Sequence, residues 1–445
     1  MSEFFPSRWK QFTWIAAIHD KSCNETEQFW DTLMMAETNI MRSALNCSTT
    51  FVVAFLVTVI SLGFYYKSRS DDFTERCAEE VDYVLSAVDS ATPGKRQRNV
   101  PRKLELKQLV NEIKNTSQVG NIPPVYPNGW FVLLESSDVG RNQVKYVAAL
   151  GQNFAVFRTS NGQARLVDAY CPHLGTDMTI GGKAKGSCIE CPFHGRQLDG
   201  SSGKCTEVPH SEKELASVHA WRICETNSFI YVWYHAEGED PTWEPHTVER
   251  IVNGDLWYTT RYERSTNCHI QDLQENVADF GHSTVIHSPK FFGKSGLWDY
   301  LEQFYHGIMQ YKFANFKWQA HKTESHITSV FNELSIILFG KFTIFQSKNF
   351  ITMFGPSCVE VRMMTSLGEV LVLTGATPLE PLCQREVLHI YARPLAILIF
   401  DRDILMFNLK KYLDKPILVK EEDAILRFRR WYSQFYSANS LRYKS

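Results

Sequence analysis

Hydrophobic residues follow three patterns along the 445-residue chain. Residues 44–66 form one apolar span, with no charge between Arg42 and Lys67. From Trp130 onward, short alternating runs such as WFVLLE and VKYVAAL are separated by turn residues, which predicts antiparallel strands. The last stretch, 421–436, predicts a docked terminal helix, because apolar residues recur at helical spacing: Ile425, Phe428, Tyr432 and Phe435.

The apolar span 44–66 is long enough to cross a bilayer as a helix. A buried core helix is the alternative, although a core helix of this length usually carries a polar face. Basic residues gather after the span, at Lys67, Arg69, Arg76 and within 95–107. The positive-inside rule therefore places the C-terminal part in the cytosol. We expect a single-pass protein of the endoplasmic reticulum membrane.

Length and composition limit the remaining possibilities. A chain of 445 residues exceeds one ordinary core. We expect five segments: a tail at 1–43, the span at 44–66, a connector at 67–126, a β-domain at 127–236 and a second domain at 237–445. The net charge of −2 gives no reason to expect a nucleic-acid partner. The 11 cysteines are odd in number and irregularly spaced, which disfavours a disulfide framework.

Two Cys/His pairs lie in the predicted β-domain. Cys171-Pro172-His173 is followed, after 17 residues, by Cys191-Pro192-Phe193-His194. Two cysteine thiolates can hold one iron of a 2Fe–2S cluster, and two neutral imidazoles the other. Several glycines crowd both loops, and backbone packed closely around sulfur needs residues without Cβ. A zinc site is the alternative, but C-x-H followed by C-x-x-H is not the usual zinc-finger order.

A second candidate metal site lies in residues 275–287, which read ENVADFGHSTVIH. Asp279 and His282 stand three residues apart, on one face if the segment is helical, and His287 follows five residues later. Two imidazoles and one distant carboxylate form a triad that leaves positions on Fe(II) open for dioxygen. Taken alone, such a pair also fits zinc or an ordinary core histidine.

The cysteine and histidine loops resemble those of the Rieske proteins. That resemblance assigns Cys171, His173, Cys191 and His194 as ligands of a Rieske 2Fe–2S cluster. Respiratory-type members carry an extra cysteine in each loop, and Thr176 and Phe193 stand at those positions. The chain is therefore more similar to the oxygenase and ferredoxin branch. Arg196 departs from that branch, in which many members have Trp.

The motif D-x-x-H-x4-H resembles the mononuclear iron site of the Rieske non-haem iron oxygenases. The resemblance assigns His282 and His287 as Fe(II) ligands, and Asp279 as a bridge from a ligand histidine to a Rieske histidine of the neighbouring subunit. Asp401, Asp403 and Asp414 are the candidates for the third ligand about a hundred residues on. The resemblance aligns Asp403 with that ligand, and Asp401 is the fallback. The implied fold class is α+β: a transmembrane helix, a Rieske antiparallel β-domain and a helix-grip (START-like) catalytic domain.

Three further stretches, PNGW, YVWYH and RRWYSQFY, resemble the steroid-acting branch that includes 3-ketosteroid 9α-hydroxylase oxygenases. With the N-terminal anchor, the chain is most similar to the animal cholesterol 7-desaturases of the Neverland type. This implies oxidation of cholesterol to 7-dehydrocholesterol in steroid hormone synthesis, a homotrimer, and electrons from NAD(P)H through a separate reductase. A steroid or other lipid hydroxylase, and a membrane-bound Rieske electron carrier, remain the alternatives.

Overall fold

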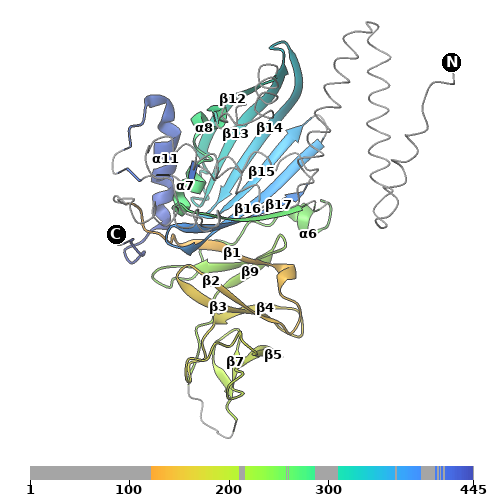
Figure 1. Ribbon diagram of the computed structural model, residues 1–445, viewed down its shortest axis with the longest axis vertical. Coiled ribbons are helices and arrows are strands. Elements are labelled where there is room, and N and C mark those ends of the chain that lie inside the picture. Colours follow the sequence, from red (N-terminus) through yellow and green to blue (C-terminus); the bar gives the residue numbers. More distant parts are fainter. Residues whose placement is uncertain are drawn as a thin grey trace, which may run out of the picture. The chain divides into compact units, whose positions relative to one another are not determined.

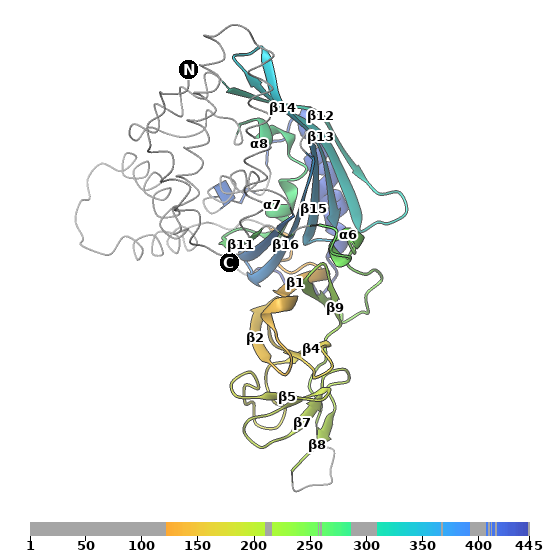
Figure 2. The ribbon, with the colours of Figure 1, turned by 90° about the vertical axis from the view of Figure 1, so that its right-hand side faces the viewer.

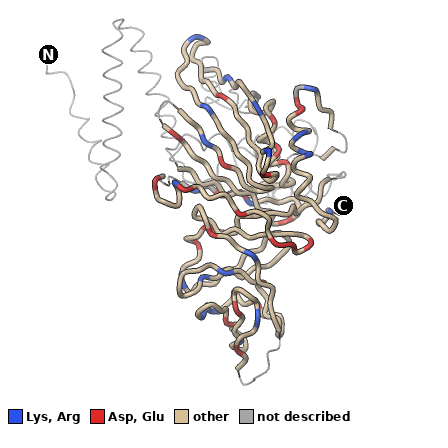
Figure 3. The backbone as a smooth tube through the Cα atoms, turned by 180° about the vertical axis from the view of Figure 1, so that it is seen from behind, with Lys and Arg blue, Asp and Glu red and all other residues tan. Residues whose placement is uncertain are grey.

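The structure is a computed structural model. It describes residues 122–209, 216–256, 258, 260–285, 309–365, 368–391, 406–407, 410, 412–413 and 416–443. Within these ranges, every helix is too short or too polar to cross a membrane. The expected span 44–66 and the tail before it lie outside the described residues, as does most of the connector. Figure 3 shows that acidic and basic residues are interspersed along the described backbone.

Ten short strands form three antiparallel sheets in the first described part of the chain. The sheet orders are β1-β10-β9, β2-β3-β4 and β5-β6-β7-β8. Their bounds are β1 Gly129–Glu135, β2 Val144–Ala149, β3 Gln152–Arg158, β4 Ala164–Asp168, β5 Lys183–Lys185, β6 Cys188–Glu190, β7 Gln197–Asp199, β8 Cys205–Glu207, β9 Ile223–Thr226 and β10 Phe229–Tyr234. A short 3-10 turn, η2 Ser136–Asp138, follows β1. The alternating runs of the sequence thus predicted the β-domain correctly.

The second described part is built on one seven-stranded antiparallel sheet of order β11-β17-β16-β15-β14-β13-β12. Its strands are β11 Thr260–Thr266, β12 Met309–Ala320, β13 Ile327–Leu338, β14 Phe342–Phe354, β15 Cys358–Thr365, β16 Gly368–Glu380 and β17 Cys383–Tyr391. The helical elements are α6 Glu249–Val252, α7 Ile270–Glu275, α8 Phe280–Val285, η3 Lys420–Glu422, α11 Asp423–Tyr432 and η4 Ser433–Phe435. Figures 1 and 2 show α7 and α8 over one face of this sheet.

The junction between β1 and the large sheet uses buried polar groups as well as apolar side chains. The Thr377 hydroxyl donates to the Val132 carbonyl at 2.7 Å, and His389 Nε2 lies 2.5 Å from Glu135 Oε1. Burial lowers the pKa of His389, while the Glu135 carboxylate opposes that shift. Because β1 is entirely buried, this junction fixes the β-domain against strands β16 and β17.

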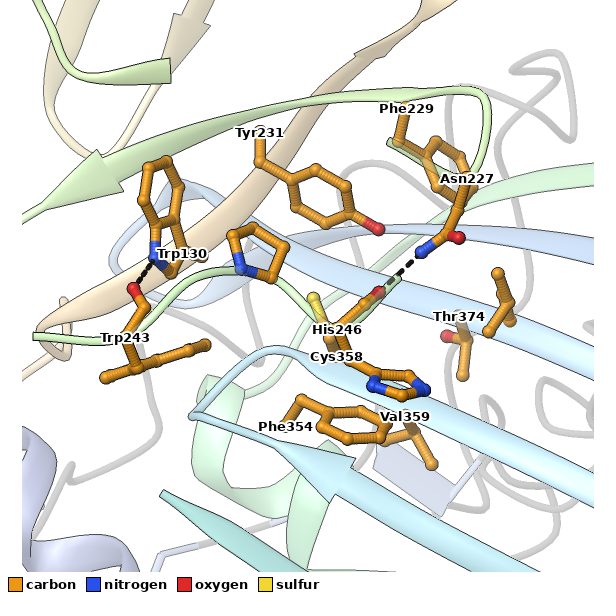
Figure 4. Close-up of a pocket in the computed structure, with 12 residues that line it drawn as sticks. Trp130, Asn227, Phe229, Tyr231, Trp243, His246, Phe354, Cys358, Val359 and Thr374 are labelled. Atoms are coloured by element: carbon orange, nitrogen blue, oxygen red, sulfur yellow. Dashed lines mark hydrogen bonds between the residues drawn. The ribbon is translucent and has the colours of Figure 1, made fainter. Parts of the chain in front are cut away.

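A small cavity lies at the same junction, between β10 and the ends of β14 and β15 (Figure 4). Its volume is about 20 Å³, which is space for roughly one water molecule. The Trp130 indole N–H donates to the Trp243 carbonyl at its rim, and burial raises the pKa of the Cys358 thiol to about 11. A cavity of this size belongs to the packing of the junction and excludes a ligand as large as a sterol.

The C-terminal helix α11 is amphipathic as predicted. Its apolar stripe enters a cluster with Ala278, Trp318 and Val330, beneath the segment that carries the candidate iron ligands. The buried members on the C-terminal side are Ala424, Ile425, Phe428, Trp431, Tyr432 and Phe435. The terminal helix therefore supports the α7–α8 segment from the side of β12 and β13.

Replacing Phe428 with Ala is expected to destabilise the protein by about 3–5 kcal/mol, because a fully buried ring leaves a cavity that the cluster cannot close. Leu426→Ala on the same helix is the control, since Leu426 is 42% exposed; its expected cost is below about 1 kcal/mol. Denaturant unfolding followed by circular dichroism measures both. Equal effects of the two substitutions would contradict the packing described here.

Candidate functional site

The two cysteine/histidine loops have the same backbone frame. In the first, the N–H of Cys171 donates to the Thr176 carbonyl at 2.8 Å, and the N–H of Gly175 donates back to Cys171 at 2.9 Å. The second loop repeats both bonds five residues apart, from Cys191 to Arg196. Gly175 and its counterpart Gly195 adopt φ values of 72° and 66°, a left-handed conformation that favours glycine.

The two loops place the candidate cysteine ligands inside the domain and the candidate histidine ligands at its surface. Cys171 and Cys191 are 2% and 1% exposed, and their side chains interact with each other. His173 and His194 lie on the surface, with ring centroids 4.8 Å apart. Thiolates inside and imidazoles outside match the donor set of a cluster with one sulfur-ligated and one nitrogen-ligated iron. The structure thus brings the two cysteines together and the two histidines together, and these donors are the ones that a Rieske cluster needs.

Burial and neighbouring groups shift the pKa values of Cys171 and His173. Burial raises the pKa of Cys171, while a hydrogen bond from the backbone N–H of His173 acts in the opposite direction. Such N–H groups are the donors that stabilise cluster sulfur. Desolvation and the charge of Arg196 lower the pKa of His173, which favours the neutral ring that binds iron. Arg196, unexpected from the family pattern, therefore acts on the electrostatics of this loop.

The surface around the two histidines is apolar. Leu174, Phe193 and Ile180 are 66%, 62% and 74% exposed. Exposed apolar side chains grouped in this way usually mark a contact surface. The imidazole edge of the site is thus placed where another protein surface can approach it.

In the second candidate site, Asp279 precedes α8 and does not lie within it. Its Oδ1 accepts the backbone N–H of His282 at 3.2 Å, as a capping carboxylate does. Its Oδ2 lies 3.8 Å from His282 Nδ1. Burial lowers the pKa of His282, and Asp279 opposes the shift. The two residues are neighbours as predicted, but through a cap geometry and not as two positions of one helix.

The other predicted iron ligands cannot be placed. His287 and Asp403 lie outside the described residues, as do the alternatives Asp401 and Asp414. Within the described ranges, no three His, Cys, Asp or Glu side chains lie together as ligands of one metal ion. The Rieske loops are included in that finding, since each iron of such a cluster takes only two protein ligands. The assignment of His287 and Asp403 as ligands of a mononuclear iron remains a prediction.

Sequence reasoning missed the charges that hold α7. Glu275 is 9% exposed, and its two oxygens accept from Arg429 of α11 at 2.5 and 2.7 Å. Asp272 accepts from Lys410 at 2.6 Å. Because the Glu275 carbonyl also accepts the backbone N–H of Asp279, these ion pairs hold the segment that leads to His282. The only sequence signal was two carboxylates three residues apart, one turn before the motif.

Two residues that follow the candidate third ligand in sequence contact the region of α7. Lys410 follows Asp403 by seven residues, and the neighbouring Tyr412 hydroxyl accepts the backbone N–H of His269 at 2.6 Å. Both contacts tie this part of the chain to α7. Lys410 and Tyr412 are therefore linked in space to α7 and the residue before it, although 138 and 143 residues separate the two contacting pairs in sequence.

Comparison with known proteins covers both described parts. The Rieske [2Fe-2S] domain family matches residues 129–225, and the 3-ketosteroid 9alpha-hydroxylase C-terminal domain family matches residues 232–436. The chain is 35% identical to the cholesterol 7-desaturase of Hemicentrotus pulcherrimus over 82% of its length and 79% of the relative's. It is 34% identical to the cholesterol 7-desaturase of Xenopus laevis, over 88% of its own length and 86% of the relative's.

Solved structures agree on the fold. The structure of dicamba monooxygenase bound to dicamba aligns with a TM-score of 0.52 at 14% identity, over 70% of this chain and 98% of that one. Together with the loop geometry, these matches show that the chain is an oxidoreductase of the Rieske oxygenase class, with a Rieske 2Fe–2S cluster as cofactor. Within that class it belongs to the family of the cholesterol 7-desaturases.

Substitution of Cys171 by Ser is expected to abolish the visible absorption and electron paramagnetic resonance signal of the cluster, because a serine hydroxyl does not replace the thiolate. Cys205→Ser is the matched control: Cys205 is a buried thiol of the same domain, and it lies on β8, outside both loops. Spectroscopy of the purified variants tests the assignment. An intact cluster in Cys171→Ser, or its loss in Cys205→Ser, would show that the ligand set is wrong.

Proposed function

We propose that this protein converts cholesterol to 7-dehydrocholesterol, with dioxygen and electrons from NAD(P)H that reach it through a separate reductase. The reaction balances when cholesterol, O₂, NAD(P)H and a proton give the diene, NAD(P)⁺ and two waters. The observation that carries the proposal is the similarity to cholesterol 7-desaturases across both described domains, at 35% identity over 82% of the chain.

The chain's own residues divide this work between two places. When bound, the Rieske cluster relays electrons and the mononuclear iron activates dioxygen. His173 and His194 would hold the exposed iron of the cluster at the surface, and His282, His287 and Asp403 would hold the mononuclear iron. Asp279 fixes the start of α8 and, with Glu275, the direction in which the His282 ring points. A carboxylate beside a ligand histidine is the usual means of orienting it.

A homotrimer fits this division. In Figures 1 and 2 the sheet β5–β8 and helix α8 lie at opposite ends of the described domains. The cluster loops flank β5–β7, and their exposed apolar rim faces outward. We infer that electrons pass from the His173 and His194 side of one subunit toward the iron site of its neighbour, with Asp279 as the bridging residue.

The membrane anchor is also part of the proposal. Cholesterol is dissolved in lipid, and an apolar span at 44–66 keeps the catalytic domain beside that supply. The basic residues after the span support a cytosolic orientation, with the endoplasmic reticulum as the membrane.

A sterol analysis tests the activity directly. Cells that express the chain and receive cholesterol are expected to accumulate 7-dehydrocholesterol. His282→Ala is expected to lower the product at least about 100-fold, since even loss of a residue that only orients a ligand costs 10–100-fold. His321→Ala serves as the control, because His321 lies on an exposed loop.

Two other outcomes are informative. If no sterol changes while the Rieske spectrum is present, the substrate is wrong and another membrane lipid must be sought. If His282→Ala retains full activity, the second metal site is wrong, and an electron carrier becomes the better explanation of the Rieske domain.

The anchor has its own test. The full chain is expected to remain in the membrane pellet after an alkaline carbonate wash. The double substitution Val53→Lys and Leu56→Lys is expected to release it, since each lysine at a helix centre costs about 2.5–3.5 kcal/mol of insertion free energy. Val53→Ala with Leu56→Ala keeps the span apolar and should stay in the pellet. Release of the unaltered chain by the wash would favour a core helix at 44–66, and retention of the lysine variant would show that this span is not what holds the protein in the membrane.

A further inference from the structure

One face of the large sheet carries the candidate iron helix. Phe280 of α8 contacts Phe316 of β12, with ring centroids 5.1 Å apart. Val277 and Ala278 pack on an apolar row that crosses four strands at one level. The row consists of Trp318, Val330, Ile351 and Val361. The segment with Asp279 and His282 therefore lies over this face of the sheet.

On β14, two residues before Ile351, the same face of the sheet becomes polar. Side chains alternate along a strand, so Ser347, Asn349 and Ile351 share one face while Gln346 and Lys348 are exposed on the other. Asn349 pairs with Asn332 across β13 and β14. Its Nδ2 donates to Asn332 Oδ1 at 2.8 Å, which leaves its own carbonyl Oδ1 as an acceptor.

That acceptor and a neighbouring hydroxyl are buried without partners in the described part of the chain. Asn349 and Ser347 are 7% and 3% exposed, and both Asn349 Oδ1 and Ser347 Oγ lack a hydrogen bond. Leaving such groups unpaired costs roughly 1–3 kcal/mol each. A native protein tolerates this cost where a ligand supplies the missing partner.

The surroundings define the ligand. Asn349 neighbours Met363 on β15, and the row continues to Val370 on β16. The neighbouring row, which contains Ile351 and Val361, ends in Val372 on β16. Val372 packs with Ile390 and Leu388. Asn332 and Thr365 are the polar cross-strand neighbours of Asn349 and Ser347, and the positions beyond them are apolar. A small polar group of side chains within an apolar surface matches a molecule that is apolar except for one polar group.

We propose that Asn349 and Ser347 bind the hydroxyl group of the sterol, so that the site selects 3-hydroxysterols over 3-ketosteroids. The sterol hydroxyl donates to Asn349 Oδ1 and accepts from the Ser347 hydroxyl. A ketone accepts from Ser347 but has no proton to donate, and it leaves Asn349 Oδ1 unpaired in an apolar site. This inference rests on the proposed function for its substrate class, and it distinguishes this chain from enzymes that take ketosteroids.

The test uses two ligands that differ only at C3, 5α-cholestan-3β-ol and 5α-cholestan-3-one. Each is titrated as a radiolabelled ligand against the purified full chain in detergent. Wild-type protein is expected to bind the alcohol about tenfold or more tightly than the ketone, the effect of one hydrogen bond of ordinary strength. Asn349→Leu is expected to bring the ratio near one by weakening the alcohol alone. Ser347→Ala is expected to weaken both ligands and to leave their ratio nearly unchanged.

Gln346→Leu is the control, because Gln346 lies on the exposed face of the same strand. The Rieske spectrum verifies that each variant is folded, and Asn349→Ala replaces the leucine variant if that one does not fold. Equal binding of the two ligands by wild-type protein would overturn the inference. So would an unchanged ratio in the Asn349 variant, the result expected if only a buried water pairs these groups. Selective binding of the alcohol without formation of 7-dehydrocholesterol would overturn the proposed function and leave this inference standing.

Discussion

The pairing of Glu275 with Arg429 is the constraint on which the catalytic domain depends. A buried carboxylate is stable as a charge only when it is paired, and removal of one partner typically costs about 3–5 kcal/mol. Arg429 supplies both hydrogen bonds from the C-terminal helix, 154 residues away. The helix that precedes Asp279 and His282 therefore takes its position from the end of the chain, and the candidate iron site forms only after the whole domain has closed.

The Rieske site, in contrast, is held together by contacts between residues that are close in sequence. Its two loops are short and contiguous, and each is shaped by backbone hydrogen bonds within six residues. Thiols are buried and imidazoles exposed because an electron-transfer site must protect sulfur and still present an edge to its partner. This site is local, whereas the site at His282 is assembled from distant segments, and their contrasting origins explain why the two were predicted unequally well.

The local features followed from the sequence. The alternating runs predicted the strands, and the spacing of Phe428 and Tyr432 predicted the buried stripe of α11. The two Cys/His motifs predicted that cysteine would meet cysteine and histidine would meet histidine across the two loops. The register of the seven-stranded sheet and the Arg429 and Lys410 ion pairs could not be predicted, because they join residues far apart in the chain. Asp279 was expected on a helix face, but a carboxylate before a first turn is more stable as a cap.

The polar pair on β14 belongs with the features that only the register reveals. In sequence, Ser347 and Asn349 are two polar residues in an otherwise ordinary strand. In the sheet they lie on the α8 side, beyond the row on which the α7–α8 segment packs, with an acceptor that a ketone cannot satisfy. A substrate hydroxyl held there fixes one end of a rigid sterol, and its rings then extend along the apolar face toward α8. On this proposal, the place of the polar pair on β14 sets how far the sterol extends along the sheet face, so the strand register contributes to the choice of the ring carbon that is oxidised.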